Sequence, residues 1–117
     1  MNAEKYQKHR EVATQLESFY VEINKLATKK PADKLTPLIS RKLNQLILKV
    51  RELVSNDTFL DAIETVSTEP QEQIRFDEAL LVTSELRTIL SKQWASTEFK
   101  NFRSEIDYRF DSQNLKG

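Results

Sequence analysis

Apolar residues recur at helical spacing along most of this chain. Between about Asn2 and Lys29 they follow one another at alternating intervals of three and four, as residues on one face of an α-helix do. The pattern predicts a long amphipathic helix with a wide buried face, for which Asn2 is a plausible N-cap. The seam of this helix consists of His9, Val12, Leu16, Phe19, Ile23 and Leu26.

A second helix is predicted from about Pro37 to Val54, after a linker in which Pro31 prevents the first helix from continuing. Its seam consists of Ile39, Leu43, Leu46, Val50 and Leu53. The run Ser55-Asn56-Asp57 then interrupts the pattern, and Asp57 is expected to cap a short third helix. That helix would carry Phe59, Ile63 and Val66 and would extend the second rod beyond a kink near Asn56.

The fourth predicted helix, from Pro70 to about Trp94, has the broadest apolar arc of the chain. After Trp94 the apolar positions move to nearly the opposite side of the same cylinder. Two interpretations remain open: the helix breaks, with Ser96 or Thr97 capping a fifth helix, or a single helix of about forty residues runs on. The change of face favours the break.

Glycine is almost missing, since the one glycine is Gly117. Tight hairpin turns and phosphate-binding loops depend on glycine, so strands and nucleotide-binding loops are disfavoured. The predicted fold is therefore all-α: an antiparallel bundle of three long rods, the second kinked near Asn56, plus a C-terminal aromatic helix. Residues 1–110 are expected to form one domain and residues 111–117 a frayed tail.

Charge and composition narrow the classes of function. The chain has 18 basic and 18 acidic residues and no cysteine, which excludes thiolate chemistry and a strong overall attraction to nucleic acid. Its longest apolar run is Ala79-Leu80-Leu81-Val82, too short for a membrane span or a signal peptide. We expect a cytoplasmic protein that does not bind membranes.

Catalytic chemistry finds little support in the sequence. His9 is the only histidine, and its place in the seam of the first helix indicates a packed residue rather than a catalytic base. One histidine without cysteine does not make a common zinc site, and the Glu-x-x-His pairs of di-iron bundles are missing. The carboxylates read as solvated helix surface. We therefore expect neither enzymatic activity, nor a cofactor, nor a metal.

Two surfaces are candidates for binding. The first is aromatic and apolar, with a helical stripe after Trp94 that would fill either a groove of the same molecule or a partner's groove. Its residues are Trp94, Phe99, Phe102, Ile106 and Phe110, with Ile74 and Leu81 lying off the main face of the fourth helix. The second is a basic face on the second helix, a candidate phosphate-binding stripe made of Arg41, Lys42, Lys49 and Arg51.

These features predict a non-enzymatic interaction module, an adaptor or assembly subunit, that binds protein or itself, as a homodimer, through the aromatic C-terminal helix. The alternative is a nucleic-acid-associated helical subunit that uses the basic face of the second helix.

Overall fold

The computed structural model describes residues 1–54 and 57–116, with side chains as far as Asp107. It is helical, with five α-helices and one 3₁₀ turn among the described residues: α1 (Ala3–Lys29), α2 (Pro37–Leu53), α3 (Thr58–Asp61), η1 (Pro70–Glu72), α4 (Phe76–Trp94) and α5 (Thr97–Lys116). No β-strand forms in the described ranges, which contain only one isolated bridge, between Lys34 and Arg75. The all-α prediction is therefore confirmed.

Side-chain caps set the beginnings of three helices as the sequence predicts. The Asn2 side chain accepts a hydrogen bond from the Lys5 amide at 2.8 Å, and Thr36 accepts one from the Ile39 amide at 3.3 Å. Asp57 accepts from the amides of Phe59 and Leu60 at 2.9 and 3.0 Å. These bonds satisfy amides that have no partner in the first turn of a helix.

Two helices are shorter than predicted. The third ends at Asp61 instead of continuing to Val66, and the fourth begins at Phe76 instead of Pro70, which starts only the 3₁₀ turn η1. Residues 62–75 form a mostly non-helical connection, here called the return segment. Side chains of α2 form hydrogen bonds with backbone groups of the return segment. These bonds stabilise a non-helical course where the spacing predicts a helix.

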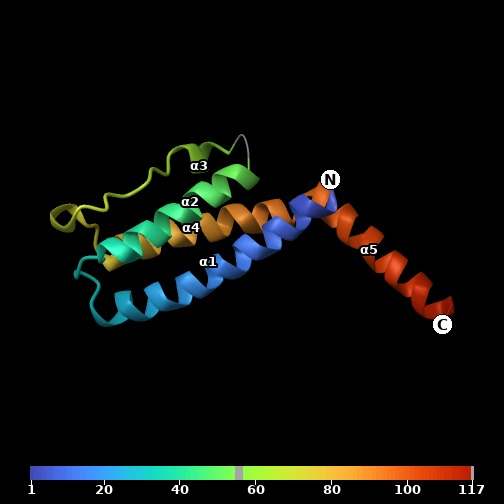
Figure 1. Ribbon diagram of the computed structural model, residues 1–117, viewed down its shortest axis with the longest axis horizontal. Helices are drawn as coiled ribbons and strands as arrows, with labels where there is room; N and C mark the ends of the chain where they lie inside the picture. The colour runs from blue at the N-terminus through green and yellow to red at the C-terminus, as the bar shows by residue number, and fades with distance from the viewer. Residues whose placement is uncertain (55–56, 117) are drawn as a thin grey trace.

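The direction of α4 differs from that of an antiparallel three-rod bundle. The Leu35 amide donates to the Ile74 carbonyl at 2.8 Å, and the Gln93 side chain donates to the Leu53 carbonyl at 2.7 Å. Because the starts of α2 and α4 meet and so do their ends, these two helices run parallel, and α1 runs against both (Figure 1). The kink predicted near Asn56 lies outside the described residues, but the chain beyond it turns back along α2.

Three polar side chains on one face of α2 secure the return segment. The Ser40 hydroxyl donates to the Gln73 side chain, and the Arg51 guanidinium donates to the Ile63 carbonyl. Asn44 pairs with both backbone groups of Val66, donating to its carbonyl at 2.9 Å and accepting from its amide at 2.7 Å. Positions 40, 44 and 51 share one face of α2, so the return segment runs along this face of the helix.

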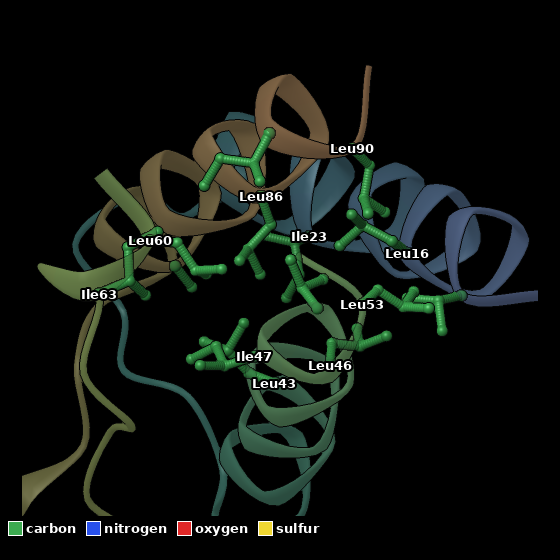
Figure 2. Close-up of a cluster of buried hydrophobic side chains, with 14 of the residues drawn as sticks. Leu16, Ile23, Leu43, Leu46, Ile47, Leu53, Leu60, Ile63, Leu86 and Leu90 are labelled. Atoms are coloured by element: carbon green, nitrogen blue, oxygen red, sulfur yellow. The ribbon is translucent and has the colours of Figure 1, made fainter. Parts of the chain in front are cut away.

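Apolar side chains of α1, α2, α3 and α4 meet in one core (Figure 2). Leu43, Ile47 and Leu86 at its centre are fully buried. Other members visible in Figure 2 are Leu16, Ile23, Leu46, Leu53, Leu60, Ile63 and Leu90. None of the described helices is both long and apolar enough to cross a membrane.

Candidate functional site

Helix α5 departs from the bundle formed by α1, α2 and α4 (Figure 1). Helix α4 ends at Trp94, Ala95 and Ser96 form the turn, and the Ser96 hydroxyl accepts a weak hydrogen bond from the Phe99 amide at 3.4 Å. From there α5 projects past the end of the bundle, beside the start of α1 (Figure 1). The structure thus resolves the two interpretations of this region in favour of the break at Ser96-Thr97.

Five rings gather where α1, α4 and α5 meet, and we call this cluster the aromatic junction: Tyr6, His9, Trp94, Phe99 and Phe102. The Tyr6 ring stacks on Trp94 at 5.5 Å and lies 4.9 Å from Phe102. Phe99 is fully buried, with its ring 4.8 Å from that of His9. Ring pairs at such separations add stabilisation beyond the burial of area, so the junction fastens the first turns of α5 to the bundle.

Charged groups surround the aromatic junction. The Arg103 guanidinium lies 4.2 Å from the centre of the Trp94 ring and donates to the Trp94 carbonyl at 2.5 Å. On the other side the Glu98 carboxylate pairs with Lys5 at 3.6 Å and with the amino group of Met1 at 3.7 Å. A cation over the indole and a bond to the last carbonyl of α4 fix the angle at which α5 leaves the bundle.

His9 is the buried polar member of the aromatic junction. Its Nε2 lies 3.2 Å from the Leu90 carbonyl oxygen, so this nitrogen carries the hydrogen and donates, while Nδ1 has no hydrogen-bond partner. Burial lowers the pKa of His9 below its ordinary value of 6.5; the Leu90 bond opposes this effect, and the charge of Arg103 adds to it. His9 thus packs against the rings of Trp94 and Phe99 while one of its ring nitrogens is bonded to a backbone carbonyl.

A groove of about 700 Å³ runs between α1 and α4 beside the aromatic junction, and we call it the α1/α4 groove. Its lining combines small, charged, aliphatic and aromatic side chains and comes from these two helices alone: His9, Arg10, Ala13, Thr14, Leu16, Glu17, Ser84, Arg87, Thr88, Leu90, Ser91 and Trp94. Sequence periodicity did not indicate this groove, because it depends on which faces of α1 and α4 meet.

The residues of the predicted apolar surface do not lie together in the structure, and they differ in burial. Phe99 is fully buried, Trp94 and Phe102 are partly buried, and Ile106 remains 39% exposed. The side chain of Phe110 lies outside the described residues. Two other predicted members are remote from the aromatic junction: Ile74 packs against the core beside α2, and Leu81 on α4 is 63% exposed.

The four predicted basic residues do not form a single uncommitted stripe. Arg41 and Lys42 are exposed, and Lys42 borders a second groove between α1 and α2 with Lys49. The Lys49 ammonium donates to the Gln15 side chain at 2.9 Å, and Arg51 holds the return segment through the Ile63 carbonyl. Two of the four cations are thus engaged within the fold. No group of three metal-ligating side chains occurs among the described residues.

Comparison of the chain with known protein families, with characterised proteins and with solved structures finds no match. Sequence reasoning identified the aromatic residues after Trp94 but did not connect them with Tyr6, His9 or Arg103. The available signal was the presence of two rings, at positions 6 and 9, on one side of the first helix.

Proposed function

We propose that this chain is a non-enzymatic protein-interaction module that docks through α5. The observation that carries the proposal is the course of α5: its first turns are fastened by the aromatic junction, and the rest projects beyond the bundle (Figure 1). All four described side chains from Ser104 to Asp107 are exposed, including the apolar Ile106.

The projecting part of α5 has little to stabilise it as a helix when no partner is bound. Twenty residues make a rod about 30 Å long. The projecting part, residues 104–116, is about 13 residues long, and an isolated helix of this length is only marginally stable in water unless it packs an apolar face against something. Phe102 and Ile106, four residues apart, lie on one side of α5 and form the described part of such a face. A docking partner would cover this face and stabilise the helix.

Hydrogen exchange measures how stable the α5 helix is without a partner, and it does not require the partner to be known. In a dilute sample without a partner, the backbone amides of α5 from Ser104 onward should exchange far faster than those of α1 and α4, because no tertiary packing supports them. Protection of these amides equal to that of α4, at concentrations where the chain is monomeric, would mean that α5 is stable without a partner and would overturn the proposal.

A pair of substitutions separates an interface residue from a core residue. At concentrations where the chain is monomeric, Ile106→Asp should leave the urea midpoint of the bundle unchanged, as should the control Leu48→Asp at a 49% exposed site on α2. A loss of stability of more than ~2 kcal/mol for Ile106→Asp alone would place Ile106 in the core, because burial of a charge without a partner destabilises by that much or more. That result would contradict docking through this face.

A further inference from the structure

The molecule contains an open groove and a projecting helix, and they begin at the same place. Trp94 lines one end of the α1/α4 groove and is also the last residue of α4, separated from the start of α5 by Ala95 and Ser96. The groove volume of about 700 Å³ lies in the range of clefts that bury bound groups, about 300–1,000 Å³. The groove is therefore large enough to accept side chains from another helix.

The surface of the groove suits a helix better than a polar small molecule. The hydroxyl of Thr14 donates to the Arg10 carbonyl at 2.9 Å, and that of Thr88 donates to the Ser84 carbonyl at 3.1 Å. The hydroxyl hydrogens of both threonines are therefore already bonded within their own helices and are not available to a ligand. Together with Ala13 they provide small side chains along the groove, over which a helix can approach closely.

Charge at the groove complements charge on α5. Arg10 lies at the groove, is exposed, and makes no ion pair with any residue in the described ranges. Asp107 follows Ile106 on α5, is exposed, and has no partner among the described residues. The other two charged residues of the groove, Glu17 and Arg87, form an ion pair with each other, with 2.9 Å between the Arg87 Nε and a Glu17 carboxylate oxygen. One cation at the groove and one anion on α5 are therefore available to each other.

We propose that two copies of this chain exchange their α5 helices, so that Ile106 of each copy lies in the α1/α4 groove of the other and Asp107 faces Arg10. This inference rests on the proposed docking function of α5 and names its partner. Helix α5 runs away from α1 and α4 of its own chain (Figure 1), whereas a second copy can present its α1/α4 groove to the projecting part. Reciprocal exchange of one element gives a closed two-fold dimer.

Disulfide trapping tests the exchange without background, because the chain has no cysteine. A Thr88→Cys chain is mixed with a differently tagged Ile106→Cys chain under mild oxidation. A disulfide requires Cα atoms within about 7 Å, so only a docked α5 brings these two positions together. We expect the mixed disulfide to form at least about tenfold faster than in the control mixture, which pairs Ile106→Cys with Leu48→Cys on α2, away from the groove.

Each outcome decides the matter. A mixed disulfide no faster than in the control overturns docking in the groove; if wild-type chains are dimeric by mass in that case, docking through α5 survives and only its site is wrong. A doubly substituted chain that forms its disulfide internally, as a monomer, shows that α5 folds into its own groove and overturns the second copy as partner. A wild-type chain that stays monomeric to millimolar concentration overturns the exchange, while fast hydrogen exchange in α5 would still support another partner.

Charge reversal gives a second test on the same contact. Arg10→Glu or Asp107→Arg alone should weaken self-association roughly tenfold, since each dimer contains the contact twice. The double variant, with both charges exchanged, should recover most of the wild-type affinity. Double-variant affinity no higher than that of the single variants would contradict the pairing of Arg10 with Asp107.

Discussion

Replacing Phe99 with alanine tests whether the aromatic junction fastens α5 to the bundle. The Phe99 side chain is fully buried, with ring centres of Tyr6, His9 and Trp94 at 6.3, 4.8 and 6.2 Å. Truncation of a phenylalanine at such a site costs about 3–5 kcal/mol through lost burial and the cavity left behind. With a urea slope of about 1–3 kcal/mol/M, the unfolding midpoint should fall by roughly 2 M.

The assay follows the two parts of the molecule separately. Trp94 is the only tryptophan, so its fluorescence reports on the aromatic junction, while circular dichroism reports on all the helices. The matched control is Phe59→Ala, at a side chain that is 66% exposed with the Lys92 ammonium 5.0 Å from its ring centre, where the loss should be at most ~1 kcal/mol. Equal effects of the two substitutions on the fluorescence transition would refute the buried position of Phe99 and the junction built on it.

Three further predictions concern single interactions. Asn44→Ala should destabilise the fold by about 1–3 kcal/mol because two backbone groups of the return segment lose their partner, whereas Asn24→Ala on the exposed face of α1 should not; urea midpoints check this. Burial lowers the pKa of His9 in the folded chain, so as the pH falls the histidine of the unfolded chain binds a proton first. The contribution of neutral His9 to the free energy of unfolding is therefore fully present above about pH 6.5 and decreases as the pH falls below it. His9→Phe should remove this part of the pH dependence between pH 7.5 and 5.5. Exchange of the charges of Arg87 and Glu17 should change stability by less than ~1 kcal/mol, because both groups are substantially exposed.

Local signals in the sequence determine most helix boundaries. Asn2, Thr36 and Asp57 each have a side chain that accepts from the amides of the following turn, and Pro31 follows the end of α1. The break after Trp94 is equally local, because the apolar face changes side there. Such features are predictable, since they depend on residues a few positions apart.

The direction of α4 and the candidate site are not local. The parallel arrangement of α2 and α4 depends on polar side chains such as Asn44, whose partner Val66 lies 22 positions away. Hydrophobic periodicity shows which face of a helix is buried but does not identify the helix that covers it. For the same reason the sequence pointed to the aromatic residues after Trp94 but not to Tyr6 and His9, which complete the aromatic junction from the other end of the chain.

The parallel arrangement of α2 and α4 also bears on how quickly the chain folds. Helical proteins usually fold fast because neighbouring helices pair through short loops. In this molecule α1 packs along α4, and the bond between His9 and Leu90 joins positions 81 residues apart. The entropy of closing so large a loop must be overcome before these contacts form, unless α2 and the return segment first bring α4 into line. We therefore expect this chain to fold more slowly than a helical bundle of equal length with sequential hairpins.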